Sequence, residues 1–218
     1  MNRQTIAVTG AAGRLGSYLL EELVDRGARV AAFVLNDEEA SRVKAHERVS
    51  IHRADLGAEA SVREAFQGIG ELSGLVHTVG GWGMTPLLET SKADFEKLVS
   101  LNLTTAFLCF REAARVMPGG GWLVAMASGQ GADRGAPGQA AYSAAKAGVV
   151  RLVESVAAEL AADGIQTLAV APSMILFDPN SGEKGVSVHQ VVRTCLSPWS
   201  DHPPQSGSVI RAYGTLTP

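Results

Sequence analysis

Short apolar segments alternate with amphipathic segments along most of the chain. The apolar runs predict seven strands, near residues 4–9, 29–35, 49–53, 74–78, 121–127, 165–171 and 207–213. Between them, apolar residues recur every three or four positions and predict helices near 14–26, 38–45, 58–68, 91–117 with an early break, 140–162 and 186–197. Apolar strands separated by helices indicate a parallel sheet covered on both faces. We therefore expect a doubly wound α/β protein with about seven strands, in one domain over residues 1–218.

A glycine-rich turn follows the first predicted strand. Residues 9–16 read TGAAGRLG and lie between an apolar run and a helical pattern. Gly10 would permit the tight turn, Gly13 the close approach of a phosphate, and Gly16 the packing of the helix on the strand. The helix N-terminus would then offer free N–H groups to a pyrophosphate. Such a turn is often only a turn, but its flanking elements favour a dinucleotide site on a Rossmann-type fold.

A tyrosine and a lysine stand four residues apart in a predicted helix. Tyr142 and Lys146 share one helix face, so their side chains can reach a common point. A free phenol has a pKa of about 10, and a fixed ammonium lowers it by favouring the phenolate. The pair would then donate and accept a proton in carbonyl–alcohol chemistry. A chance pair is the alternative, and the glycine turn is what argues against it.

In this order, the two motifs resemble the short-chain dehydrogenase/reductase family, and the resemblance covers nearly the whole chain. Asp55-Leu56 follows the third strand, where the family places an acid near the adenine. Residues 78–81 (TVGG) follow the fourth strand, where the family usually has Asn-Asn-Ala-Gly. Asn102 stands where the family carries its catalytic Asn, and residues 171–175 (APSMI) match the loop that holds the nicotinamide.

The resemblance implies an NAD(P)H-dependent oxidoreductase that transfers hydride to a carbonyl or a conjugated C=N of a small molecule. Tyr142 would donate the proton, Lys146 would lower its pKa and bind the nicotinamide ribose, and Asn102 would hold a water. The implied catalytic residues are Tyr142, Lys146, Asn102 and Ser128. The implied cofactor-binding residues are Thr9, Gly10, Gly13, Arg14, Leu15, Gly16, Asp55, Leu56, Gly80, Gly81, Tyr142, Lys146, Pro172, Ser173 and Ile175.

The catalytic serine of the family is displaced in this sequence. It usually lies 13 residues before the Tyr, and that position is Gly129, with Ser128 one residue earlier. Adjacent side chains of a strand point to opposite faces, so Ser128 can substitute only if the backbone bends. Residues 129–131 (GQG) would allow such a bend. The alternative is a strand-end serine bonded to the backbone.

Some features resemble the dihydropteridine reductases within the family. They are the spacing of the glycine turn, Gly80-Gly81-Trp82, Pro137-Gly138 and the run 206–210 (SGSVI). A quinonoid dihydropterin accepts hydride at an activated ring, so it depends less on a serine. Asn102 instead follows the general family pattern. Trp82 could stack on a flat heterocycle or be a packing residue.

The choice between NADP and NAD stays open, with a slight preference for NADP. NAD-specific members place an Asp at the end of the second strand, and that place is Val34 or Leu35 here. Asp37 lies beyond it. Without an acid there, a 2′-phosphate meets no repulsion, and Arg14 could bind it or could be a solvated helix-start residue.

Composition excludes several other classes. The net charge is −3 without a Lys/Arg cluster, which argues against nucleic-acid binding. No apolar run approaches the ~18 residues of a membrane span. The chain enters a strand at once, so we expect no signal peptide and a cytoplasmic location. Cys109, Cys195 and the five scattered histidines predict no metal site.

Two further expectations concern the C-terminal half. Residues 179–204 form either a short substrate lid or a surface connector. The helix with Tyr142 carries small and β-branched residues on more than one face, which predicts a homodimer, or a homotetramer, unless that helix is simply well buried in the monomer. A cofactor-binding redox sensor or partner protein with weak catalysis is the rival function, motivated by Gly129. An epimerase or dehydratase is a third, but the C-terminal region leaves little room for a sugar-nucleotide domain.

Overall fold

The computed structural model describes Met1 and residues 4–178 and 180–216. Its main sheet has seven strands in the order β3-β2-β1-β4-β5-β6-β9, and every neighbouring pair is parallel. The strands are β1 (Thr5–Thr9), β2 (Arg29–Val34), β3 (Val49–Arg53), β4 (Gly74–His77), β5 (Gly121–Met126), β6 (Ile165–Pro172) and β9 (Ser208–Ala212). The predicted doubly wound sheet is confirmed, with each strand within about two residues of its expected bounds.

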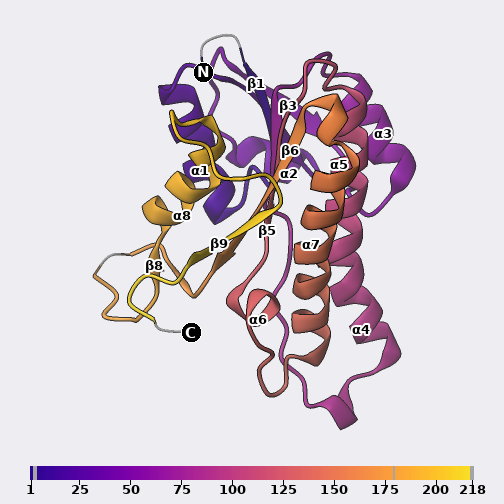
Figure 1. Cartoon of the computed structure of the whole chain (residues 1–218), viewed down its shortest axis with the longest axis vertical. Coiled ribbons are helices and arrows are strands. Elements are labelled where there is room, and N and C mark those ends of the chain that lie inside the picture. Colours follow the sequence, from indigo (N-terminus) through magenta and orange to yellow (C-terminus); the bar gives the residue numbers. More distant parts are fainter. Residues whose placement is uncertain (2–3, 179, 217–218) are drawn as a thin grey trace.

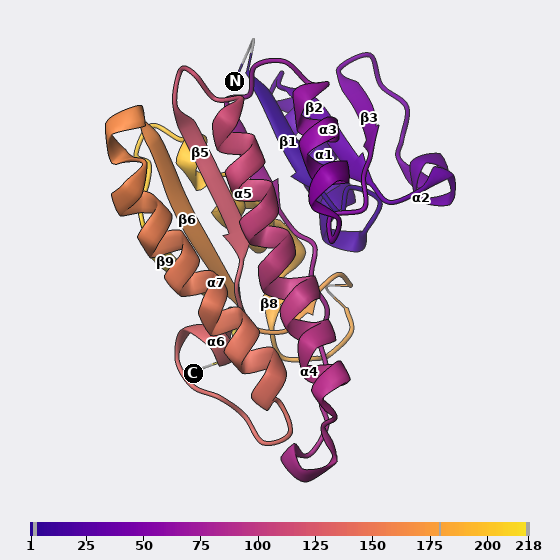
Figure 2. The ribbon, with the colours of Figure 1, turned by 90° about the vertical axis from the view of Figure 1, so that its right-hand side faces the viewer.

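Helices cover both faces of this sheet (Figures 1 and 2). One face carries α1 (Arg14–Asp25), α2 (Asp37–Arg42) and α8 (Val188–Cys195). The other carries α3 (Glu59–Gln67), α5 (Thr105–Arg115) and α7 (Ala140–Glu159), while α4 (Lys92–Val99) extends α5 beyond the sheet. Two cores result, one on each side of the strands.

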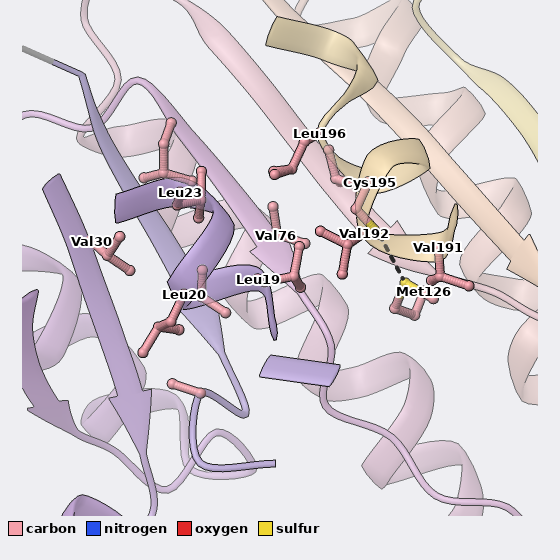
Figure 3. Packing of buried hydrophobic residues seen from close by; sticks show 14 of the residues in the cluster. Leu19, Leu20, Leu23, Val30, Val76, Met126, Val191, Val192, Cys195 and Leu196 are labelled. Carbon is pink, nitrogen blue, oxygen red and sulfur yellow. Dashed lines mark hydrogen bonds between the residues drawn. The ribbon is translucent and has the colours of Figure 1, made fainter. Parts of the chain in front are cut away.

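Alternation along β5 explains why the strands are apolar throughout. Trp122, Val124 and Met126 face the core under α1 and α8, whereas Leu123 and Ala125 face the core under α5 and α7. Figure 3 shows the first core, where Cys195 of α8 reaches Met126 with 3.5 Å between the sulfur atoms. Strands buried on both faces need apolar residues at every position.

The strand order reverses between β1 and β4. The chain runs outward from β1 to β3 and then returns to the other side of β1. Thr78, just past β4, bonds to Thr9 at the end of β1 through its N–H (3.0 Å) and its hydroxyl (2.7 Å). In open α/β sheets, the crevice at such a switch point is where ligands bind.

The long helix predicted over 91–117 is interrupted as expected. A π-helical segment, Ser100–Thr104, joins α4 to α5. The prediction did not include the four-residue helix α6 (Gly129–Ala132) or the strands β7 (Ile175–Leu176) and β8 (Val186–Ser187), which pair with each other. All three are too short to produce a hydrophobic period.

The region expected to be a lid or connector forms part of the core. Residue 179 lies outside the described residues. From residue 186 onward, β8 and α8 bury Val188, Val191, Val192 and Cys195 against α1 and the sheet. These contacts favour a connector that completes one helical layer. Within the described range 180–204, no residue lines the hollow described below.

Candidate active site

The glycine turn leads from β1 into α1 as the sequence predicts. Gly10 has φ +62°, which favours glycine. A Cβ at Gly16 would lie 2.1 Å from the Gly10 carbonyl oxygen, so only glycine fits where the helix meets the turn. No side chain caps the N-terminus of α1, and its first turn holds no acid. The uncapped N–H groups make an anion site that suits a pyrophosphate.

A hollow of about 630 Å³ lies at the carboxyl ends of the strands, beside this turn. We call it the central hollow. It brings together residues from five separate parts of the chain. Among the predicted site residues its walls include Leu15, Gly80, Gly81, Ser128, Tyr142, Lys146, Pro172, Ser173 and Ile175. Its volume is that of a typical small-molecule site.

The predicted residues outside its walls lie around it. Thr9 is buried and holds Thr78. Asp55 and Leu56 follow β3, next to the end of β2, and the Asp55 carboxylate accepts from the Gly57 N–H at 2.9 Å. The Arg14 guanidinium lies 3.8 Å from the centre of the Phe177 ring.

Ser128, and not Gly129, faces the central hollow. Strand β5 ends at Met126, and Ser128 is the N-cap of α6, where its hydroxyl oxygen accepts from the Gly131 N–H at 3.2 Å. The backbone therefore bends as residues 129–131 allow. Ser128 also acts on the Tyr142 phenol, whose pKa it lowers in opposition to burial. Gly129 faces the Tyr213 ring instead.

The environment of Tyr142 differs from the expectation in its electrostatics. The pKa of the phenol is raised, chiefly because burial disfavours the phenolate. Burial also lowers the pKa of Lys146 to about 8, because the ammonium loses hydration. Lys146 Nζ donates to the Met126 carbonyl at 2.7 Å. The predicted lowering of the Tyr142 pKa by Lys146 is thus wrong for the protein alone, where burial dominates.

Asn102 lies in the π-helical segment and ties it to the loop after β4. Its Nδ2 donates to the carbonyls of Gly81 and Leu98, both at 2.9 Å, and its Oδ1 accepts from the Gly81 N–H at 3.1 Å. A Cβ at Gly80 would lie 2.6 Å from Asn102 Oδ1 and 3.0 Å from Lys146 Nζ. Gly80 thereby lets the amide and the ammonium approach each other. Because Nδ2 already uses both of its hydrogens, a water could bond only to a carbonyl oxygen of Asn102, in the side chain or in the main chain.

Sequence reasoning missed His77, the last residue of β4. The ring is buried, and its nitrogens lie 3.0 Å from Thr9 Oγ1 and 3.3 Å from Thr105 Oγ1. Burial, aided by the charge of Lys146, lowers its pKa to about 3, so it stays neutral. His77 thereby connects the end of β4 to Thr9 of β1 and to Thr105 of α5. The only feature of the sequence that could have identified His77 as a site residue was its position at the end of a predicted strand, before Thr78.

Across the described residues, the structure has no group of three or more side chains that could ligate a metal. No helix in the described part of the chain is long and apolar enough to cross a membrane.

The sequence and the fold match known proteins. Residues 4–184 match the family model described as short chain dehydrogenase. D-threitol dehydrogenase of Mycolicibacterium smegmatis is 30% identical over 203 residues, which are 86% of this chain and 77% of that protein. A 3-oxoacyl-[acyl-carrier-protein] reductase of Synechocystis sp. is 30% identical over 190 residues, which are 82% of this chain and 76% of that protein. The structure of a citronellol catabolism dehydrogenase of Pseudomonas aeruginosa superposes with a TM-score of 0.86 at 27% identity, covering 97% of this chain and 93% of that one.

Proposed function

The chain belongs to the short-chain dehydrogenase/reductase family and is an NAD(P)-dependent oxidoreductase, and from this premise we propose that it interconverts a carbonyl and a secondary alcohol on a small molecule. The observation that carries the proposal is the convergence of Ser128, Tyr142 and Lys146 in the central hollow, next to the glycine turn. The rival role, that of a redox sensor, does not require these three side chains to lie together.

The protein residues have distinct parts in the proposed reaction. The glycine turn and the N-terminus of α1 would hold the pyrophosphate, and Pro172, Ser173 and Ile175 the nicotinamide end. The nicotinamide supplies or accepts the hydride when it is bound. Ser128 would donate its O–H to the substrate oxygen, since its lone pair already accepts from Gly131. Tyr142 would give that oxygen a proton, and its raised pKa keeps it in the acid form at neutral pH.

Lys146 would balance the negative charge that Tyr142 acquires when it gives up its proton. When the phenol becomes a phenolate, the nearby ammonium stabilises it, and the same charge can bind the nicotinamide ribose. Asn102 would fix Gly80 and Gly81 beside Lys146 and could hold a water through its carbonyl oxygen. A Lys146 with a pKa of about 8 can also pass a proton onward.

The relatives suggest the substrate class. The names of three relatives refer to D-threitol, to a 3-oxoacyl-[acyl-carrier-protein] and to 2,3-dihydroxy-2,3-dihydro-p-cumate; the last of these proteins, from Pseudomonas putida, is 32% identical. Each name includes a hydroxyl or an oxo group, which supports carbonyl–alcohol chemistry. With Ser128 in the hollow, the reason for favouring a dihydropterin weakens. A quinonoid dihydropterin stays the second candidate, supported by Trp82, which lines the hollow and is 64% exposed.

A substrate panel tests the proposal. Purified protein is assayed at 340 nm with NADH and NADPH against cyclic and acyclic ketones, 3-oxoacyl thioesters and quinonoid dihydropterin, and in reverse with polyols and cyclic diols. We expect turnover on ketones or secondary alcohols. Turnover on the pterin alone would favour the second candidate, and tight cofactor binding without any turnover would favour the sensor.

Contacts at the end of β2 lead us to propose NAD as the preferred cofactor, against the preference for NADP drawn from the sequence. The Glu39 carboxylate folds back and accepts from the Leu35 N–H at 2.8 Å. This places an acid just past β2, beside the turn, whose Ala11 N–H donates to the Phe33 carbonyl at 3.1 Å. An acid there can bind a ribose hydroxyl and repels a 2′-phosphate. Arg14 stacks on Phe177, which takes it away from that role.

Glu39→Gln is expected to shift the cofactor preference toward NADP. The amide keeps the shape and an acceptor for Leu35 but removes the charge facing the 2′-phosphate. We expect the ratio of kcat/KM for NADPH to that for NADH to rise about tenfold, equivalent to about 1.4 kcal/mol. Glu38→Gln makes the same charge change on a neighbouring exposed residue and should alter the ratio little. Equal ratios in both variants would contradict the assignment.

We also propose a homodimer, extensible to a homotetramer, formed through α5 and α7. A groove between these helices is lined by Phe107, Leu152 and Val156, and Phe107 is 44% exposed. Light scattering measures the mass in solution, and a monomeric mass at working concentrations would contradict this assembly.

A further inference from the structure

Tyr213, just after β9, is hydrogen-bonded to two segments beside the central hollow. Its hydroxyl donates to the Asp133 carboxylate at the end of α6, which also accepts from Arg211 Nε at 2.6 Å. Its own carbonyl accepts from the Ser173 hydroxyl at 2.9 Å. Ser173 belongs to the loop after β6, whereas α6 begins at Ser128. Tyr213 therefore connects the proposed nicotinamide loop to the helix that carries the serine.

Helix α6 is held between Tyr213 and the helix of Tyr142. It has four residues, too few to be stable alone. On one side, a Cβ at Gly131 would lie 2.5 Å from the main-chain carbon of Lys146, so glycine allows direct contact with α7. On the other side, a Cβ at Gly129 would lie 3.3 Å from the Tyr213 ring. Because both residues are glycines, α6 can contact α7 on one side and the Tyr213 ring on the other.

The position of α6 decides where the Ser128 hydroxyl points. The Ser128 oxygen accepts from the Gly131 N–H, so its rotamer is tied to the first turn of α6. The remaining O–H can then donate into the hollow, toward the substrate oxygen and Tyr142. If α6 moved away from α7, the cap and the direction of this donor would change together. A misplacement of about 1 Å at a reacting group can cost on the order of 100-fold in rate.

We propose that Tyr213 is a positioning residue that presses α6 onto α7 through its bond to Asp133 and thereby aims the Ser128 hydroxyl. This inference rests on the proposed function of Ser128 and Tyr142. It also gives Gly129 a reason: the residue that stands in the usual place of the serine makes room for the Tyr213 ring. Neither Tyr213 nor Asp133 lines the hollow in which Ser128 and Tyr142 meet.

A double-mutant cycle tests the proposal. Tyr213→Phe keeps the ring against Gly129 and removes only the bond to Asp133. We expect kcat to fall about tenfold while the dissociation constant for NADH, measured by fluorescence, stays within twofold. If Tyr213 acts through Ser128, the double variant Ser128→Ala/Tyr213→Phe will be no slower than Ser128→Ala alone. An unchanged kcat in Tyr213→Phe, or losses that multiply in the double variant, would overturn the proposal.

Hydrogen exchange provides a readout that needs no turnover. In Tyr213→Phe, amides of the segment 128–134 should exchange faster, while those of α7 beyond Lys146 stay protected. Unchanged exchange in 128–134 would overturn the proposal even if no substrate had been found. Tyr18→Phe is the matched control, because the Tyr18 hydroxyl has no hydrogen bond to any residue that the structure describes. It should leave kcat and the exchange of 128–134 as in the wild type.

Discussion

Tyr142→Phe is expected to lower turnover by a factor on the order of 10²–10⁴, the usual contribution of a positioned proton donor. The phenylalanine ring fills the same space, and the proposed cofactor site around the glycine turn is untouched. Steady-state assays on whichever ketone or alcohol the panel identifies measure the loss. Binding of NADH, followed by fluorescence, should change little.

The pH profile sharpens this expectation. Burial raises the pKa of Tyr142, so the phenol is protonated through the neutral range. Reduction, which needs the acid form, should be flat there, whereas alcohol oxidation, which needs the base form, should rise with pH. Ser128→Ala is the companion variant, with a smaller loss expected because it removes a hydrogen bond and leaves the proton donor. A Tyr142→Phe variant as active as the wild type would exclude Tyr142 as the proton donor.

The fold follows from patterns that act over short distances along the chain. Each strand is an apolar run because both of its faces are buried, and β5 shows this residue by residue. The glycine turn was recognisable because the contact of Gly16 with Gly10 leaves room for no side chain. The same kind of reasoning located the break in the helix after α4, though not its π-helical geometry.

The parts of the site that the sequence left open depend on distant contacts. Whether Ser128 faces the hollow depends on α6, and α6 depends on Tyr213, about 80 residues away along the chain. Strand alternation alone could not decide the direction of Ser128, because β5 stops two residues before it and the backbone then bends into α6. Glu39 was overlooked because its carboxylate reaches the Leu35 N–H across the turn that begins α2, a contact that the spacing of residues does not show.

The electrostatics of the helix pair could not be predicted from spacing. A lysine four residues from a tyrosine suggests a lowered phenol pKa, but that reasoning omits hydration. Both groups are largely buried, so each loses stabilisation of its charged form. The outcome is a neutral phenol beside a lysine whose own charge is costly to maintain. The buried ammonium of Lys146 therefore lowers the stability of the folded protein, and the proposed reaction uses its charge.

Lys146→Met tests that conclusion, because it should abolish most activity and yet stabilise the protein at neutral pH. The folded pKa of Lys146 is about 8, below its ordinary 10.5. The unfolded chain therefore holds this proton more tightly, and the free energy of unfolding rises with pH between about 8 and 10.5. At pH 7 the buried ammonium costs about 3 kcal/mol by this linkage. Methionine removes that cost but leaves the Met126 carbonyl without its donor, a loss of about 1–3 kcal/mol.

The net gain at pH 7 should be about 1 kcal/mol, or about 2–4 °C in Tm, measured by thermal melting. Because the wild type alone gains about 1.4 kcal/mol per pH unit between about 8 and 10.5, the advantage of Lys146→Met should vanish near pH 9 and reverse above it. Lys97→Met, on the exposed surface of α4, should show no such pH-dependent difference. If the stability difference between Lys146→Met and the wild type were the same at every pH from about 7 to 10.5, folding would not lower the pKa of Lys146, and burial would not destabilise its ammonium.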